Sequence, residues 1–477
     1  MNVTTFDVQE TAFMLLAQLC TQKVYKHKKY PTKNTKTNED RLQEAKELLI
    51  RAFDSTELYV EHLKKKKSGG YRKIHEPPPD LKEVQRYLLK WLSRIVKRTD
   101  YYRTGYAGWQ AWRGLSYTGV AEHFLKAYIH GSRQKRSVAS AVQVHTQAND
   151  NYVVEFDFKD AFPSVKKDQV ASVLEKIIST EFKSYFVTYK DKDARKSGVR
   201  YRDFSYLACV DGFTQIAHQY FQKGLNDAYA RFPLFSNKEC PELRKLVRQQ
   251  ANIYEKYEDT CFIELANVLA DLLSQLAVYQ DSIPQGAPMS GLLLNLVVSS
   301  LKYFRPQDFT YVSSVSIYVD NIILTMLKKP TEEFLNSFEN SIDRTEIFKA
   351  NREKTKVFDL RNQTAPLLGM KLVLRPAKQN EIDHIRSGEW PKGFERAQRT
   401  DRKWMIKHTT LSKNIQKKYR SMIHKAIVSD VDGKYLDKVH GCVGHIVSVY
   451  GWSTTNMPSC LSKVVHSFRD KYKLNNQ

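Results

Sequence analysis

The sequence contains few cysteines, and they lie far apart without a pairing pattern. The six are Cys20, Cys209, Cys240, Cys261, Cys442 and Cys460. No two of them form a Cys-x-x-Cys pair, and none combines with histidine at the spacing of a zinc site. This pattern excludes a disulfide-stapled small domain and a zinc module, and we expect reduced thiols in a cytoplasmic protein.

Long hydrophobic runs are also missing. The apolar run AFMLLAQL near the N-terminus is too short to span a bilayer, and no basic segment precedes it. We therefore expect a helix that packs on the protein body and no membrane partner. The chain of 477 residues is 42% hydrophobic, which is typical of a globular protein. This length predicts roughly three domains.

Acidic residues are too few to balance the basic ones. The chain has 52 acidic residues against 76 lysines and arginines, which gives a net charge of +24. Such an excess favours a polyanionic partner, and nucleic acid before membrane. Between residues 375 and 425 the basic residues are interleaved with Trp390, Phe394, Trp404 and Tyr419. This pattern predicts phosphate contacts and base stacking, or alternatively a solvated helix face with a buried aromatic seam.

Apolar spacing predicts a mixture of helices and strands. Residues 1–60 read as helical around a polar, lysine-rich loop, and residues 81–95 carry apolar side chains at helical spacing. NYVVEFDFK predicts a buried strand that ends in a turn at Pro163, and IYVDNIILT predicts a hairpin. Neither a repeat nor a low-complexity tract interrupts this pattern. The fold class is therefore α+β.

Two carboxylates lie at the ends of apolar strand segments, Asp157 in the first and Asp320 in the second. Either one alone is more often a turn former than a ligand. If the two strand ends are neighbours in one sheet, their oxygen atoms can bind Mg²⁺. A pair of such ions activates a hydroxyl and neutralises a leaving pyrophosphate.

Several segments resemble the motifs of reverse transcriptases, in the family's order. DFKDAFPS, PQGAPMSGLLLN and YVDN resemble the palm motifs, and RKIHEPPPDLKEVQRYLL resembles the fingers motif of group II intron, retron and related bacterial enzymes. GYAGWQAWRGLSYTGVAEH is similar to their next block, and NREKTKVFDL with PLLGMKLV resembles the last palm strands. YLDKVHGCVGHIVSVYG is similar to the thumb helix. The resemblance covers about residues 60 to 455.

The resemblance implies a right-hand polymerase fold with fingers, palm and thumb. It predicts an N-terminal helical extension at 1–60 and fingers at 61–150. The palm, an antiparallel sheet with helices, would occupy 151–374 and contain an insertion at about 185–260. A helical, basic thumb would occupy 375–477, in which Arg402, Lys403 and Lys407 would contact nucleic acid. Little follows the thumb, so we expect no nuclease, RNase H or maturase domain.

The resemblance also assigns the metal site. Asp157, Asp320 and the backbone carbonyl of Phe158 would bind two Mg²⁺ ions, which Mn²⁺ could replace. Lys354 corresponds to a lysine that protonates pyrophosphate, although a surface lysine at a helix end would look the same. Asn321 stands where the family has a second aspartate. Its amide oxygen can still coordinate a metal, so we expect a working catalytic site in which Asn321 takes part.

Five further residues are implied to bind the nucleotide. Phe162 would lie under the ribose and exclude a 2′-hydroxyl, so the preferred substrate would be a dNTP. Gln285 and Gly286 would support the base pair, and Lys65 and Arg72 would grip the triphosphate. Core packing for Phe162 and a solvated loop for Lys65 are the alternatives.

Two further departures bear on the type of enzyme. Gly291 replaces a proline that usually follows the serine, here Ser290, of the loop that contains Gln285 and Gly286 (the Gln-Gly loop). The separation of Asp157 from Gln285 is also longer than usual in the family. The altered hairpin motif and the insertion that this longer separation implies favour a defence-associated enzyme over a retron enzyme.

Three functions follow from this resemblance. The first is an RNA-directed DNA polymerase that makes cDNA from a structured non-coding RNA in bacterial antiphage defence. The second is a template-independent or protein-primed DNA polymerase of the abortive-infection type. The third is an inactive reverse-transcriptase fold that only binds RNA. The sequence leaves the template, the primer and an oligomeric assembly open.

Overall fold

The computed structural model describes residues 7–21, 37–65, 69–98, 142, 144–146, 151–190, 260–301, 311–387, 397–400, 403–450 and 457–472. Most of the lysine-rich loop predicted at 25–40, the block at 105–123, most of the predicted insertion, and Arg402 lie outside these residues, and the end of that predicted loop belongs to a helix that begins at Asn38. The chain divides into two units. The first unit comprises residues 1–110 and 160–301, and the second comprises residues 111–159 and 302–477.

The first unit is mainly helical. Its elements are α1 (Val8–Thr21), α2 (Asn38–Asp54), β1 (Val60–Lys65), β2 (Tyr71–Glu76), α3 (Pro79–Arg98), α7 (Ala161–Ser164), α8 (Lys167–Lys190), α12 (Thr260–Ala277) and α13 (Ser290–Ser300). As predicted, α3 buries a complete apolar stripe, consisting of Leu81, Val84, Leu88, Leu92 and Ile95. Helix α12 packs on α8 and α1, and these helices form the core of the unit.

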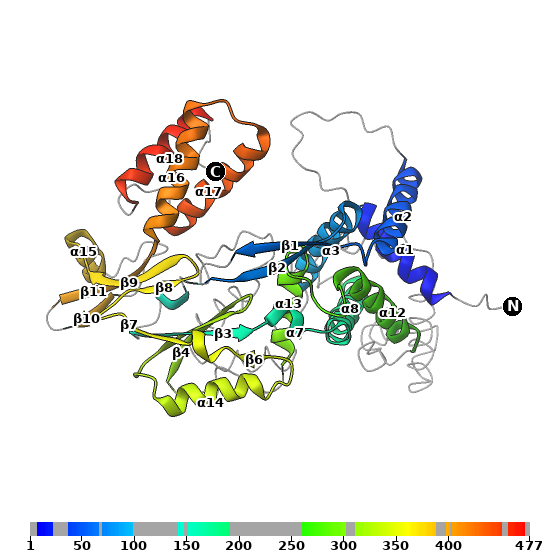
Figure 1. Ribbon diagram of the computed structural model, residues 1–477, viewed down its shortest axis with the longest axis horizontal. Coiled ribbons are helices and arrows are strands. Elements are labelled where there is room, and N and C mark those ends of the chain that lie inside the picture. The colour runs from blue at the N-terminus through cyan, green and yellow to red at the C-terminus, as the bar shows by residue number, and fades with distance from the viewer. Residues whose placement is uncertain are drawn as a thin grey trace, which may run out of the picture. The chain divides into compact units, whose positions relative to one another are not determined.

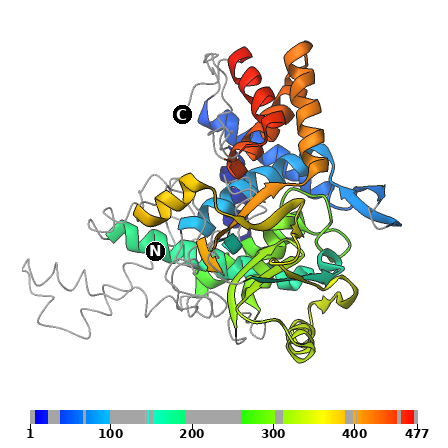
Figure 2. The same cartoon turned by 90° about the vertical axis from the view of Figure 1, so that its left-hand side faces the viewer.

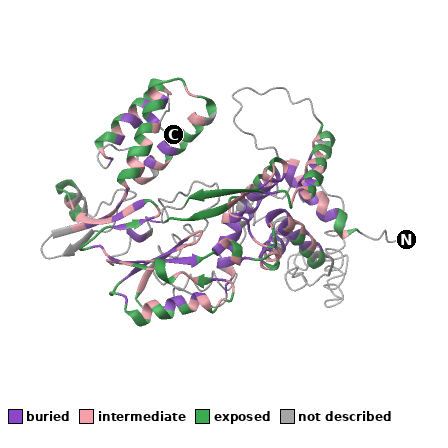
Figure 3. Ribbon diagram, viewed as in Figure 1, coloured by how far each residue is buried: buried purple, intermediate pink, exposed green. Residues whose placement is uncertain are grey.

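Strands β1 and β2 form a separate antiparallel pair in this unit. Most of their side chains are exposed, as Figure 3 shows by the green colour of both strands. A hairpin with two solvated faces is marginally stable alone, so its position depends on what holds its base. One anchor is the buried Gln85 of α3, whose Nε2 donates to the Tyr59 hydroxyl and to the Leu276 carbonyl at 2.9 and 2.7 Å.

The second unit contains an antiparallel sheet with the order β4-β5-β3-β6, and β7 also pairs with β3. Its elements are a 3-10 turn, η2 (Val144–Thr146), then β3 (Tyr152–Lys159), β4 (Val312–Tyr318), β5 (Asn321–Met326), α14 (Glu332–Asp343), β6 (Lys349–Ala350), a second 3-10 turn, η8 (Arg352–Lys354), and β7 (Lys356–Asp359). Helix α14 covers one face of this sheet (Figure 1). The ring of its Phe338 stacks on Phe156 of β3, with centroids 4.3 Å apart.

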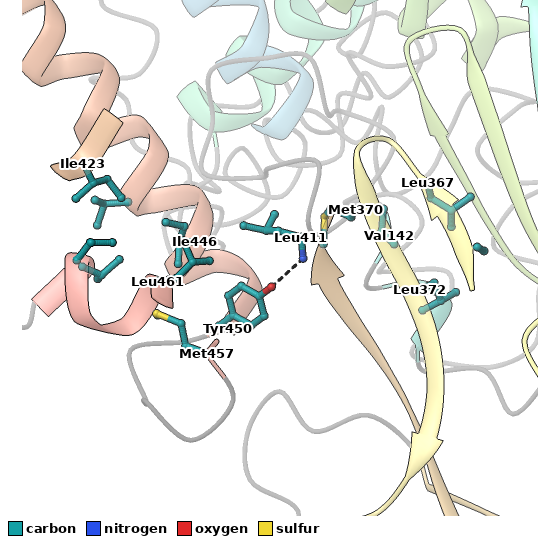
Figure 4. Close-up of a cluster of buried hydrophobic side chains, with 14 of the residues drawn as sticks. Val142, Leu367, Met370, Leu372, Leu411, Ile423, Ile446, Tyr450, Met457 and Leu461 are labelled. Atoms are coloured by element: carbon teal, nitrogen blue, oxygen red, sulfur yellow. Dashed lines mark hydrogen bonds between the residues drawn. The ribbon is translucent and has the colours of Figure 1, made fainter. Parts of the chain in front are cut away.

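A second sheet of the same unit has the order β10-β11-β9-β8. The remaining elements are β8 (Ala365–Leu367), β9 (Met370–Pro376), α15 (Gln379–Ser387), β10 (Ala397–Thr400), β11 (Lys403–Leu411), α16 (Lys413–Val428), α17 (Gly433–Tyr450) and α18 (Ser459–Lys471). Figure 2 shows the orange and red helices α16–α18 packed as one bundle. A continuous apolar cluster joins this bundle to the sheet, and the Leu411 amide donates to the Tyr450 hydroxyl at 2.8 Å (Figure 4).

The mixed α+β class is confirmed, and two local predictions are wrong. The region from residue 375 onward was predicted to be helical, but β10 and β11 lie between α15 and α16. The segment KWMIKHTTL alternates buried and more exposed side chains over its second half, which is the period of a strand. The predicted turn at Pro163 is instead the short helix α7. Within the described residues, no helix is both long and apolar enough for a membrane span.

Candidate active site

The two predicted carboxylates lie at one edge of the β4-β5-β3 sheet. Asp157 pairs with Asn321 in the β3–β5 ladder, so its backbone is one residue away from that of Asp320 in register. The Phe158 amide donates to the Asp320 carbonyl at 2.9 Å, which extends the ladder to the tip of the hairpin. The structure therefore brings together two residues that are 163 positions apart in the sequence.

The tip of the hairpin is conformationally strained. Tyr318 pairs with Asn321, which leaves a two-residue turn of Val319 and Asp320. Val319 has φ of 58°, and a β-branched residue rarely adopts a positive φ. Such a conformation costs on the order of 1–3 kcal/mol. The Phe158–Asp320 backbone bond helps to hold this turn in place.

Asp157 is nearly buried and has two polar side-chain partners. The Lys354 ammonium donates to its Oδ1 at 2.8 Å, and the Asn351 amide donates to the same oxygen at 3.2 Å. The Asn351 backbone amide also donates to the Asp157 carbonyl at 2.8 Å. Asp157 is 7% exposed, whereas the Lys354 side chain is 56% exposed. The predicted Lys354 therefore reaches the predicted carboxylate from a solvated position.

Asn321 has a hydrogen bond that an aspartate could not make when ionised. Its Nδ2 donates to Oδ1 of Asp320 at 2.8 Å. An ionised carboxylate only accepts hydrogen bonds, so a second aspartate here would repel Asp320. The amide thus orients Asp320 while its own oxygen stays available as a metal ligand.

A third carboxylate, Glu155, lies two residues before Asp157 and therefore on the same face of β3. Burial raises the pKa of Glu155, and the charges of Asp157 and Asp320 raise it further, while Lys356 and Lys354 oppose this shift. Burial and then Asp320 also raise the pKa of Tyr318. Negative potential is therefore concentrated at this edge. Side chains two residues apart in a strand share one face, and this spacing was the sequence signal from which Glu155 could have been predicted to lie beside Asp157.

The donor chemistry of this edge fits a hard divalent cation. Asp157 and Asp320 supply carboxylate oxygens, Asn321 an amide oxygen and Phe158 a carbonyl, and Mg²⁺ prefers oxygen ligands of these kinds. No group of three or more His, Cys, Asp or Glu side chains close enough to hold a metal occurs in the described part of the chain. A metal at this edge would therefore need backbone, amide, substrate or water oxygens besides the two aspartates.

The predicted Gln-Gly loop lies against strand β2 within the first unit. The His75 amide donates to the Gln285 carbonyl at 2.8 Å, and the Ser290 hydroxyl donates to the Pro284 carbonyl at 2.6 Å. Gly286 has φ of +119°, and a Cβ there would lie 2.6 Å from Cγ2 of Ile74. Only glycine permits both this conformation and this close approach.

Strand register separates the two predicted phosphate-binding residues. Arg72 pairs with Lys64, whereas Lys65 pairs with Tyr71. Since side chains alternate along a strand, Arg72 and Lys64 share the face of Ile74, which contacts the Gln-Gly loop, and Lys65 lies on the opposite face. Sequence reasoning therefore missed Lys64, because the four-lysine run does not reveal which lysine pairs with Arg72.

Phe162 lies in α7, at its second residue, and is neither buried nor fully exposed. It is therefore absent from the set of fully buried core residues, unlike Phe156 and Phe158 of the preceding strand.

The predicted nucleic-acid contact at Lys407 is wrong. Lys407 lies in β11 with no exposed surface, and its charge lowers the pKa of the buried His145, although burial is the larger cause of that shift. Lys403 begins β11, and Arg402 lies outside the described residues. Exposed cations instead follow α16, which contains no acidic residue. They are Lys413, Lys417, Lys418, Arg420 and Lys425.

The sequence matches no protein-family model and no curated protein. Among solved structures, it is similar to telomerase from Candida albicans in complex with a fragment of telomeric RNA. The identity is 12% and the TM-score is 0.30, over 92% of this chain and 60% of the telomerase chain. So low a score does not establish a shared fold.

Proposed function

We propose that this protein is an RNA-directed DNA polymerase that works by two-metal nucleotidyl transfer. The observation that carries the proposal is the pairing of strands β3 and β5, which places Asp157 beside the hairpin tip that carries Asp320. The charges of Asp157 and Asp320 both raise the pKa of Glu155, so both carboxylates lie near this third one. The motif order, which resembles that of reverse transcriptases, supplies the reaction class.

Within this proposal, each residue of the carboxylate edge has a chemical role. Asp157 and Asp320 would hold two Mg²⁺ ions with the Phe158 carbonyl. When bound, these ions supply Lewis acidity toward the attacking hydroxyl and the leaving pyrophosphate. Asn321 orients the Asp320 carboxylate through its amide. Lys354 balances the charge of Asp157, and its solvated ammonium can turn to donate a proton to pyrophosphate.

The resemblance assigns the nucleotide contacts to a separate set of residues. Arg72 offers a planar donor fork suited to phosphate oxygens, and Lys64 lies beside it on the same face. Gln285 and Gly286 would support the base pair, and Phe162 would restrict the 2′ position of the sugar.

We further propose a structured non-coding RNA as the template and a DNA product, in the cytoplasm of a bacterium and in the service of antiphage defence. The net charge of +24 and the exposed cations of α16 support an RNA partner. Protein-primed or template-independent synthesis by the same metals is the second candidate, favoured by the intact Asp157–Asp320 pair independently of any template.

The deciding experiment is to purify the protein with its bound nucleic acid and to sequence both RNA and DNA. An RNA-directed polymerase yields a defined RNA and DNA complementary to it, and addition of Mg²⁺ and dNTPs extends that DNA. Template-independent synthesis yields DNA without a matching RNA, and an inactive binder yields RNA alone. Asp157→Ala is the control that should abolish DNA in the first two cases.

Phe162→Ala tests the sugar contact. The smaller side chain should allow ribonucleotides into the product, because it removes the steric block at the 2′ position. Unchanged discrimination in a folded variant would assign Phe162 to packing alone.

A further inference from the structure

Arg352 joins the turn that carries Lys354 to helix α14. Its Nη1 donates to Oε2 of Glu339 at 2.5 Å, and its Nη2 donates to Oδ1 of Asn340 at 3.1 Å and to Oδ2 of Asp343 at 2.9 Å. The three acceptors lie in the last two turns of α14, so the guanidinium of Arg352 is hydrogen-bonded to the C-terminal part of this helix.

Glu339 makes this contact more than a surface ion pair. Its side chain is only 6% exposed, and its other oxygen accepts a hydrogen bond from the Thr355 hydroxyl at 2.6 Å. An ionised carboxylate at such depth is stable only when it is paired and hydrogen-bonded. Arg352 and Thr355 flank Lys354 in the sequence, so both partners of Glu339 come from the same short turn.

The same turn projects two groups in the other direction, toward Asp157. Asn351 contacts Asp157 through its backbone amide and its side chain, and Lys354 contacts Oδ1 of Asp157. Helix α14 is in turn fixed to β3 by the stacked rings of Phe338 and Phe156. The turn is therefore held between a buried carboxylate of the helix and a candidate catalytic carboxylate of the strand.

We propose that Arg352, acting through the buried Glu339, is the positioning residue that sets Lys354 and Asn351 against Asp157. This inference rests on the proposed polymerase function. Arg352 itself contacts neither Asp157 nor any other candidate metal ligand. Its guanidinium is suited to the task because a planar fork can hold Glu339 and Asp343 together, whereas an ammonium group is a point donor.

The structure offers a matched control in Arg361. Its side chain is 49% exposed, compared with 47% for Arg352, and it also pairs with an acidic side chain, Asp359. That pair lies at the opposite end of β7 from the η8 turn. Arg361→Gln thus removes a similar guanidinium–carboxylate contact without disturbing the turn of Lys354.

The functional test measures single-nucleotide incorporation by Arg352→Gln, Arg352→Lys, Arg361→Gln and Lys354→Met, with Arg352→Gln also placed in the Lys354→Met background. Misplacing Lys354 should lower kcat about 10-fold in Arg352→Gln while the KM for dNTP stays nearly constant. Arg352→Lys should recover part of the loss, and Arg361→Gln should match the unmodified protein. In the Lys354→Met background, Arg352→Gln should have little further effect. Full additivity of the two losses would overturn the inference.

A second measurement does not require polymerase activity. Hydrogen exchange of the peptide over residues 349–356 should accelerate in Arg352→Gln, because the Asn351 amide loses its fixed acceptor on Asp157. Exchange over β3 and α14 should stay slow, which shows that the variant folds, and Arg361→Gln should exchange normally at 349–356. Unchanged exchange in Arg352→Gln would reject the positioning role even if the protein proves not to be a polymerase. Accelerated exchange with no DNA synthesis by the unmodified protein would instead reject the proposed function alone.

Discussion

Asp157 and Asn321 are cross-strand partners in the β3–β5 ladder, and Asn321 donates a hydrogen bond to its neighbour Asp320. Asn321 is therefore the cross-strand partner of one candidate metal ligand and the chain neighbour of the other. Its position explains how an asparagine can stand at a place where the resembling family has an aspartate, because it orients one carboxylate without adding a third negative charge.

Loss of either carboxylate should abolish DNA synthesis. Asp157→Ala or Asp320→Ala removes a metal ligand that contributes several kcal/mol to the transition state, so we expect a loss of roughly 100-fold or more in kcat. RNA binding should persist, because the exposed cations are untouched. Primer extension and an RNA-binding assay on the same preparations check this. Normal incorporation by either variant would contradict the metal assignment.

Asn321→Ala should be less damaging than Asp320→Ala. The alanine variant keeps both carboxylates but loses the hydrogen bond that orients one of them, which is worth roughly 1 kcal/mol. We expect a reduction of about 10-fold in kcat and a higher Mg²⁺ requirement, measured by titrating Mg²⁺ in the extension assay. An equal loss in the two variants would mean that Asn321 is itself an essential ligand.

Lys64 should matter more than Lys65 for nucleotide binding. The β1–β2 register places Lys64 beside Arg72 and turns Lys65 to the other face. Lys64→Ala should therefore raise the KM for dNTP several-fold, and Lys65→Ala should leave it almost unchanged. Steady-state kinetics for the pair provide the measurement, and each variant serves as the control for the other. The reverse order would show that the opposite face of the hairpin binds the triphosphate.

RNA binding should depend on α16 and not on Lys407. Changing Lys413, Lys417 and Arg420 to glutamate should weaken RNA binding and flatten its salt dependence, since each phosphate contact contributes about −0.7 to −0.9 to the slope of log K against log salt. Lys407→Met should leave that slope unchanged because its side chain is buried. Filter binding at several salt concentrations checks both. A normal slope in the α16 variant would place the RNA elsewhere.

The stability of the second unit should fall in mild acid because of His145. Its ring nitrogens lie 2.5 and 2.7 Å from the hydroxyls of Thr325 and Ser316, and burial lowers its pKa from 6.5 to about 3. Between these values the unfolded state binds a proton that the folded state excludes, so stability is complete above pH 6.5 and decreases as the pH falls toward 3.

Urea unfolding at pH 7 and pH 5 measures this effect. The unmodified protein should lose up to about 2 kcal/mol from this one group over that interval. His145→Gln should be less stable at pH 7 but should show a smaller loss at pH 5. Replacing the exposed His424 of α16 by glutamine is the matched control and should leave the pH dependence unchanged. An unaltered pH dependence in His145→Gln would contradict the assignment.

Local sequence patterns were enough to predict the α+β class, the apolar face of α3, strand β3 and the β4–β5 hairpin. These features follow from local periodicity, in which the spacing of apolar side chains decides both the element and its buried face. The identity of Asp157, Asp320 and Lys354 as candidates came from the same sequence, through the motifs that surround them. The contact between Lys354 and Asp157 was not predicted from the motifs and is seen in the folded structure.

The neighbours of these residues could not be predicted from the sequence and follow from the packing of the fold. Strand register selected Lys64 over Lys65 as the partner of Arg72, and the packing of β11 buried Lys407, whose charge the sequence alone assigned to the surface. The sequence also does not reveal that Arg352 pairs with Glu339 of a helix 13 positions earlier. Register, burial and long-range ion pairs depend on which helices and strands pack together, and neither composition nor local spacing specifies that packing.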